Sequence, residues 1–402
     1  MQHQNIVFHG VLKQIPWGLF DRLVERHDAD PDARGLKSKA HLIAMLYAQL
    51  CGARGLREIE ANLRSHASKL YHLGGSTVSR SALSSANASR PVEVFTGLLM
   101  AQLQSGYRRK IRDCVRLIDS TGVPLSRLSG DWAMFSAGVC GAKAHIIYDP
   151  DADQPLYLMV TAGNINDITA AKEMPIEPGA TYVFDLGYYD YGWWARLHQA
   201  ACRIVTRLKA NTPFEVAEDR PVAAGSSILS DRLGHLPKRL AASRRNPMSD
   251  LVREVKVVIE TGKVLRLLTN DLTASAQEIA DLYKRRWAIE LFFRWVKQTL
   301  KIKHFLGVSE NAVRIQITVA LIAFVLLRLA HDAYPIVRST LAFARLIRAN
   351  LMHRRSIAQL LQASSPPGSR PQQAAFDFEA YATRAARRRR ATRACPEIMR
   401  AA

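Results

Sequence analysis

The amino-acid sequence predicts an α/β protein: a mixed sheet flanked by helices, with a mostly β insertion and an α-helical N-terminal domain. Apolar residues recur at helical spacing through the first hundred positions, short β-branched and aromatic runs dominate from about Val115, and helical periodicity returns after Ser275. The length of 402 residues allows one large domain or two to three smaller ones. We expect a helical N-terminal domain at residues 1–108 and a central α/β domain that carries the chemistry at residues 109–335. The insertion lies inside the central domain at about residues 214–270, and a C-terminal helical segment with its tail occupies residues 336–402.

The N-terminal domain is predicted from its helix signals. An apolar run at residues 41–50 indicates a helix that Gly52 ends, Gly55 precedes a second helix, and Pro91 leads into another. The module is compact and basic. Its composition fits a contact with DNA ends and, equally, a scaffold or dimerisation element.

Two short apolar strands each run into an aspartate. Val115–Ile118 is followed by Asp119, and Thr181–Phe184 is followed by Asp185. We expect each strand to end there, so that both carboxylates are held rigidly at one edge of the sheet. A lone aspartate after a strand is more often a turn residue or a helix N-cap, so neither is decisive alone. Further strands are predicted at residues 145–149, 156–161, 202–208, 252–259 and 264–268.

Ser275 begins the next helical pattern, with Glu278 at the capping-box position. We expect one continuous helix from there through Glu290 and past Lys297. The later apolar stretch Ile317–Leu327 is about half the length needed to span a bilayer, so we interpret it as a buried helix.

Four residues of the predicted helix share one face. Tyr283, Arg286, Glu290 and Lys297 fall within a strip roughly 60° wide at about 100° per residue. A carboxylate between two cations and a phenol suits a metal ligand beside a phosphate, because arginine binds phosphate bidentately and lysine adds a point charge. Trp287 is a candidate for stacking on an unpaired base.

The charge balance points to a polyanionic partner. Lys plus Arg number 56 against 35 Asp plus Glu, a formal net charge of +21. Nucleic acid is the first partner to consider and an anionic membrane the second. The polar start of the chain does not resemble a signal peptide.

The cysteines and the C-terminal tail carry less information. The five cysteines show no CxxC spacing, which argues against a zinc knuckle and a disulfide framework and fits a reducing cytosol. Residues 364–368 resemble a linker, and six arginines in residues 384–393 indicate a disordered tail. The tail could serve only non-specific electrostatic attachment, or be a frame-shifted or read-through end.

Two strand-end aspartates and a helical glutamate form a candidate metal site. Carboxylate oxygens are the ligands that Mg²⁺ prefers, and three can hold two ions for an in-line phosphoryl transfer. Each feature has a simpler explanation: Glu290 could only pair with Arg286 or Arg294 on the helix surface, and Trp287 could lie in the core. The combination with the positive charge favours metal-dependent chemistry on nucleic acid.

The same residues resemble a known family. The spacing Tyr283-x2-Arg286-x3-Glu290-x6-Lys297 matches the Y-R-E-K signature of the insertion-sequence-4-like DDE transposases of bacteria. The resemblance covers roughly residues 5–330 and includes the helical N-terminal domain. The three acidic motifs and the basic strand after the second are matched by residues 117–121, 184–188, 282–293 and 206–211.

The resemblance implies a ribonuclease-H-like core and a function. Asp119, Asp185 and Glu290 would bind two Mg²⁺ ions, for which Mn²⁺ can substitute. The enzyme would cleave double-stranded DNA at the terminal inverted repeats of its element and transfer the strands to target DNA. A homodimer in a synaptic complex, a cytoplasmic location at the nucleoid and no membrane partner are expected. The residues implied to contact DNA are Tyr283, Arg286, Trp287, Lys297, Arg207 and Lys209.

One position departs from the family pattern. The second motif usually reads Asp-Arg-Gly-Tyr, whereas Leu186 replaces the arginine here. Weaker DNA binding or cutting would follow if that arginine contacts DNA. A nuclease or resolvase with the same triad, and a decayed transposase or regulator that binds ends without catalysis, are the alternatives.

Overall fold

The computed structural model describes most of the chain, which divides into two units between Ser356 and Ile357. The second unit contributes helix α15 (Ile357–Ala363). The predicted linker and arginine-rich tail lie outside the described residues. The described residues are 6–31, 35–104, 114–238, 245–299, 305–334, 337 and 339–363.

The N-terminal part of the first unit is helical, as predicted. The expected helix ends where Gly52 adopts a left-handed conformation, with φ of 75°. The serine-rich stretch after residue 76 also contains a helix, whose N-cap is Ser79. The helices are α1 (Val7–Leu12), α2 (Trp17–Arg26), α3 (Ser38–Cys51), α4 (Leu56–Ser65), α5 (Ala67–Leu70), α6 (Arg80–Ser89) and α7 (Val92–Gln104).

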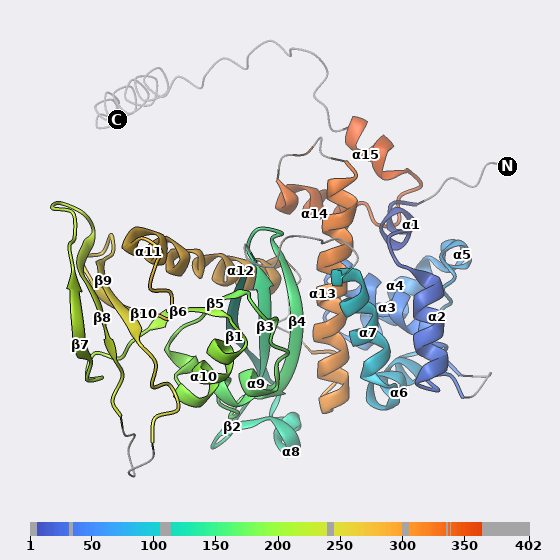
Figure 1. Ribbon diagram of the computed structural model, residues 1–402. Helices are drawn as coiled ribbons and strands as arrows, with labels where there is room; N and C mark the ends of the chain where they lie inside the picture. The colour runs from blue at the N-terminus through green and yellow to red at the C-terminus, as the bar shows by residue number, and fades with distance from the viewer. Residues whose placement is uncertain are drawn as a thin grey trace, which may run out of the picture. The chain divides into compact units, whose positions relative to one another are not determined.

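A mixed sheet forms the centre of the molecule (Figure 1). Its core runs in the order β4–β3–β1–β5–β6, in which the first three strands are antiparallel neighbours and the last two lie parallel to β1. This is the mixed sheet that the sequence predicts. The core strands are β1 (Val115–Leu125), β3 (Val139–Asp149), β4 (Gln154–Ala162), β5 (Thr181–Val183) and β6 (Arg203–Arg207), and β2 (Met134–Ser136) pairs with the edge of β3.

The β insertion continues the same sheet. Strand β10 pairs antiparallel with β6, and β9, β8 and β7 follow in that order. Both strands predicted inside the insertion are present. The four strands are β7 (Glu215–Arg220), β8 (Ile228–His235), β9 (Val252–Val258) and β10 (Val264–Thr269).

The expectation that the first strand ends at Asp119 was wrong. Strand β1 continues to Leu125 and stays paired with β3 over its whole second half. The polar residues after Asp119 resemble a turn locally, but β3 supplies backbone partners for them across the sheet. Strand β5 does end before Asp185, whose side chain caps the short helix η4 (Leu186–Tyr188) by accepting from Gly187 N–H at 2.8 Å.

Helices cover both faces of the core sheet (Figure 1). On one face an aromatic cluster, built from strand residues such as Phe184 and helix residues such as Trp193 and Trp194, is buried under α9 (Asp167–Glu173) and α10 (Tyr191–Gln199). On the other face lie α11 (Ala276–Arg285) and α12 (Trp287–Thr299).

The single helix predicted from Ser275 is two helices. The N-cap is confirmed, because Ser275 Oγ accepts from Glu278 N–H at 3.1 Å. The helix stops at Arg285, however, and restarts at Trp287. Between them Arg286 N–H bonds to the Tyr283 carbonyl three residues back, at 3.1 Å, which tightens the turn.

Helix α13 (Glu310–Asp332) is the buried apolar helix that the sequence predicts. It is long and apolar enough to cross a membrane by length and composition, yet 83% of its most apolar window is buried within the protein. It packs against α3, α6 and α7 of the N-terminal part, and α14 (Thr340–Ala349) follows it.

Candidate functional site

Three charged residues lie in one row across the centre of the sheet. The pairing of β1 with β5 ends at Leu117 and Val183, and the pairing of β5 with β6 ends at Val183 and Val205. Asp119, Asp185 and Arg207 each come two residues later along the chain. Residues two apart on a strand share a face, so these side chains leave the same face, one strand spacing of about 4.8 Å apart. The sheet register therefore brings the two aspartates side by side.

Glu290 is joined to this row by Arg286. The Arg286 guanidinium pairs with Glu290 Oε1 and lies 3.4 Å from Asp119 Oδ2. The side chains are 17% exposed for Asp119 and Arg286 and 31% for Glu290. Because Arg286 occupies the break between α11 and α12, its side chain reaches the sheet while Glu290 approaches from the first turn of α12.

The electrostatics show that the carboxylates crowd one another. Burial, together with the charges of Asp185 and Glu290, raises the pKa of Asp119 to about 6, although the Ser120 N–H and Arg286 lower it. A cluster of this kind disfavours full ionisation unless a cation is close. Arg286 supplies part of that compensation.

Tyr283 completes the inner part of the site. Its ring is buried, and the Arg286 guanidinium carbon lies 5.9 Å from the ring centroid. Burial raises the pKa of the Tyr283 hydroxyl, while the neighbouring cations Arg286 and Arg207 lower it and Asp185 raises it. The phenol therefore lies among the charged residues of the row.

The remaining predicted residues lie around this centre. Lys297 lines a small cavity with Thr121, two residues along β1 from Asp119, and burial lowers its pKa. Trp287 is 51% exposed, so the alternative that it belongs to the core is wrong. Lys209 is exposed, with its ammonium 4.4 Å from the Tyr189 ring centroid.

A family model described as a transposase DDE domain matches residues 110–326, more than half of the chain. The chain belongs to the DDE transposase family. A second model, a domain of unknown function called DUF4372, matches residues 3–76 of the transposase.

Bacterial relatives agree with this assignment. A putative transposase, y4zB, of Sinorhizobium fredii is 42% identical over 72% of this chain and 81% of its own length. A probable transposase for insertion sequence element IS5377 of Geobacillus stearothermophilus is 30% identical over 58% of this chain and 62% of its own. A putative transposase for insertion sequence element IS4SA of Synechocystis is 27% identical over 68% of this chain and 78% of its own length. The insertion-sequence-4-like resemblance is confirmed.

The transposase fold is ribonuclease-H-like, as expected from the family and from the sheet order. Among solved structures, a cryo-EM piggyBac transposase synaptic complex with hairpin DNA matches with a TM-score of 0.47 and 10% identity. That match covers 100% of this chain and 88% of the other.

The family implies dependence on a divalent metal ion. In the described part of the chain, no three His, Cys, Asp or Glu side chains lie close enough to form a metal site as they stand. The arrangement explains this, because Arg286 lies between Asp119 and Glu290. The residues nevertheless fit a hard cation, because they are carboxylates whose like charges repel one another and which already attract the cationic group of Arg286.

Sequence reasoning missed Asp167, at the start of α9. Its carboxylate accepts from Ser120 Oγ at 2.9 Å and from Lys143 Nζ at 3.1 Å. Ser120 follows Asp119 directly, so this fourth carboxylate contacts the strand segment that carries the first. The local sequence at Asp167 is that of an ordinary helix start and gives no functional signal.

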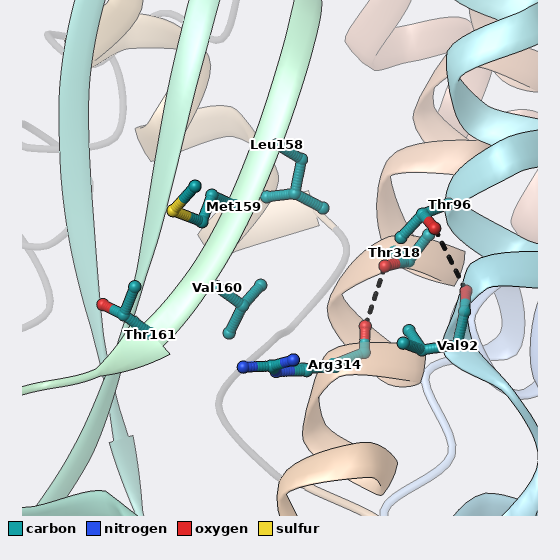
Figure 2. A pocket seen from close by; sticks show the side chains of 8 residues that line it. All are labelled: Val92, Thr96, Leu158, Met159, Val160, Thr161, Arg314 and Thr318. Carbon is teal, nitrogen blue, oxygen red and sulfur yellow. Dashed lines mark hydrogen bonds between the residues drawn. The ribbon is translucent and has the colours of Figure 1, made fainter. Parts of the chain in front are cut away.

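A larger cavity lies elsewhere, between β4, α7 and α13 (Figure 2). Its volume is about 360 Å³. Its two helical hydroxyls are used within their own helices, since Thr96 donates to the Val92 carbonyl and Thr318 to the Arg314 carbonyl. None of the predicted site residues lines it.

Proposed function

We propose that this transposase cleaves DNA at the ends of its element and joins them to target DNA, with Asp119, Asp185 and Glu290 as the metal-binding residues. The observation that carries the proposal is the in-register pair of aspartates, with Glu290 tied to it through Arg286. A carboxylate set of this kind suits two Mg²⁺ ions, with Mn²⁺ as a substitute. Bound there, the ions would activate the attacking oxygen and stabilise the leaving oxygen.

Arg286 changes partner during this function. In the structure it compensates Asp119 and Glu290. Divalent ions would take over that compensation and release the guanidinium, whose planar donors match a phosphate. Arg286 would then hold the DNA backbone next to the carboxylates, with the Tyr283 phenol beside it.

The other cations extend the DNA path on the same face. Arg207 ends the row on β6, and Lys209 lies two residues beyond it at the surface. Lys297 follows Glu290 along α12 and supplies a further positive charge. Trp287 presents an exposed ring at the start of α12, where it can stack on an unpaired base.

The partners follow from the reaction. The terminal inverted repeats and the target are double-stranded DNA, and bringing two ends together requires a homodimer in a synaptic complex. We place the protein in the bacterial cytoplasm at the nucleoid, where its substrate is.

The test is end cleavage of a supercoiled plasmid that carries the terminal repeats, with EDTA, Mg²⁺ or Mn²⁺. We expect metal-dependent cleavage that falls by at least about three orders of magnitude in Asp119→Ala and Glu290→Ala, because the metal supplies both roles in the reaction. End binding in a gel-shift assay should persist in both variants.

The matched control is Asp281→Ala, which removes an exposed carboxylate from α11. It should cleave like the parent. Equal cleavage by Asp119→Ala and the parent would refute the site. Parent protein that binds ends but does not cut in any metal would favour the alternative, a decayed transposase or regulator.

A further inference from the structure

A polar network lies behind the carboxylate row, on the opposite face of β1. Ser120 follows Asp119 and so points to the other side of the sheet. Its hydroxyl donates to Asp167 Oδ1 at 2.9 Å, while its backbone N–H donates to Asp119 Oδ1 at 2.8 Å. One residue therefore contacts both carboxylates, one on each face.

Lys143 fixes the position and the charge of Asp167. Its ammonium lies on β3, 3.1 Å from Asp167 Oδ1 and 2.8 Å from the Ile165 carbonyl. His145 Nδ1 is 3.8 Å from the same carboxylate oxygen, but burial lowers the pKa of His145 to about 4, so the imidazole is neutral near pH 7. The lysine is thus the compensating cation.

Gly187 brings Asp167 next to the second aspartate of the row. Its N–H donates to Asp185 Oδ1 at 2.8 Å. A Cβ at this position would lie 3.0 Å from Asp185 Oδ1 and 3.1 Å from Asp167 Oδ2. The glycine backbone therefore lies close to both carboxylates, and a side chain at this position would require one of them to shift.

Tyr188 marks the centre of this arrangement. Its ring is fully buried. Burial raises the pKa of its hydroxyl well above the ordinary value, and Asp119, Asp167 and Asp185 all raise it further. The phenol is thus near enough to both aspartates of the row and to Asp167 for their charges to act on it.

We propose that Asp167 is a positioning residue: it holds Asp119 through its hydrogen bond with Ser120, and by lying beside Gly187 it confines the turn whose N–H bonds to Asp185, so that the two aspartates keep a fixed separation. The proposal rests on the function proposed above and assigns the network a purpose within it. Like-charged carboxylates repel each other, and metal ligands must be held within about 0.5 Å of their working geometry. A compensated carboxylate that bonds to the Ser120 hydroxyl and lies beside Gly187 supplies that restraint.

The first experiment needs no metal. Hydrogen exchange is measured over residues 115–125 and 184–188, because the Ser120 and Gly187 amides donate to the two site carboxylates. Asp167→Ala should speed exchange of both segments about tenfold or more, because Ser120 loses a charge-assisted hydrogen bond and Gly187 loses the carboxylate packed beside it. Ser120→Ala removes only the link to β1 and should speed exchange in 115–125 alone.

The matched control is Asp190→Asn. It removes a carboxylate that pairs with Lys172 at 2.7 Å, so it loosens the anchoring of α9 without touching Ser120 or Gly187. Exchange in both segments should match the parent. An equal increase in Asp190→Asn and Asp167→Ala would show a merely structural role and would overturn the proposal.

The second experiment measures Mn²⁺ binding without DNA by titration calorimetry. The binding heat that is present in the parent and absent in Asp119→Asn is the heat of binding at the proposed site. Asp167→Asn should bind Mn²⁺ about 10- to 100-fold more weakly than the parent, as residues that orient metal ligands do. Unchanged affinity and unchanged exchange would reject the role of Asp167. Parent protein without Asp119-dependent Mn²⁺ binding would instead refute the proposed function, and the exchange data would still decide on Asp167.

Discussion

The two faces of the core sheet differ although the same strands build both. On the α10 side, Phe184 packs against Trp193 with ring centroids 4.8 Å apart, and the indoles are almost fully buried. On the α12 side, the next residue along the chain, Asp185, joins a crowded set of carboxylates. One position along a strand thus separates a closely packed aromatic cluster from charges that oppose one another.

This difference teaches how the stability is distributed. Burial of aromatic side chains is strongly favourable, and the aromatic cluster holds β1, β5 and β6 in register. The opposite face carries a buried carboxylate, Asp119, whose pKa is raised, which is unfavourable for the metal-free fold above that pKa. The stability that the aromatic face contributes therefore offsets the unfavourable electrostatics of the carboxylate face.

The largest effect on stability is expected from Trp193→Ala. The substitution removes a fully buried indole and leaves a cavity, so the free energy of unfolding should fall by about 3–5 kcal/mol. Chemical denaturation of the metal-free protein measures it. Trp287→Ala, on the exposed ring of α12, should change it by less than about 0.5 kcal/mol. Similar losses in both variants would remove the contrast between the faces.

A smaller effect of opposite sign is expected from Asp119→Asn. The folded-state pKa of about 6 lies above the ordinary aspartate value of 3.8, so the folded protein holds this proton more tightly and loses stability as pH rises between those values. At pH 8, in EDTA, the amide should raise stability by about 1–2 kcal/mol, and below pH 4 the gain should vanish.

Thermal unfolding at the two pH values checks this, with Asp281→Asn as the exposed control. Added Mn²⁺ should raise the stability of the parent to that of Asp119→Asn at pH 8, because the ion compensates the carboxylates. The same ion should raise the stability of Asp119→Asn by less. A variant that is less stable than the parent at pH 8 would show that Asp119 is not electrostatically unfavourable there.

Local signals predicted much of the fold. The N-cap at Ser275 and the end of α3 at Gly52 depend on residues within one helical turn, and both predictions are confirmed. The apolar run before Asp185 also predicted β5 correctly. The full length of β1 escaped prediction because its second half depends on β3, whose residues come later in the chain.

The site could be predicted only in part. The spacing of Tyr283, Arg286 and Glu290 identified the family, but the helix break at Arg286 was missed. Helical periodicity continues through it, and the residue contacts Asp119, 167 positions away. Asp167 was missed for the same reason, since the pairing of β1 with β3 brings Ser120 and Lys143 to it. The roles of the individual site residues stay predictions.

The smallest expected effect tests how far the charged face extends. Leu186 stands directly after Asp185, half-buried at the start of η4, at the position where the motif that the sequence resembles has arginine. Leu186→Arg should tighten binding to the terminal repeats by one phosphate contact and steepen the salt dependence of log K by about 0.9. Leu128→Arg adds the same charge at a position 75% exposed in another part of the sheet domain. If Leu128→Arg steepens the slope equally, the gain is general electrostatic attraction. If only Leu186→Arg does so, the DNA path passes beside Asp185, and the face with unfavourable charges is the face that binds the ends.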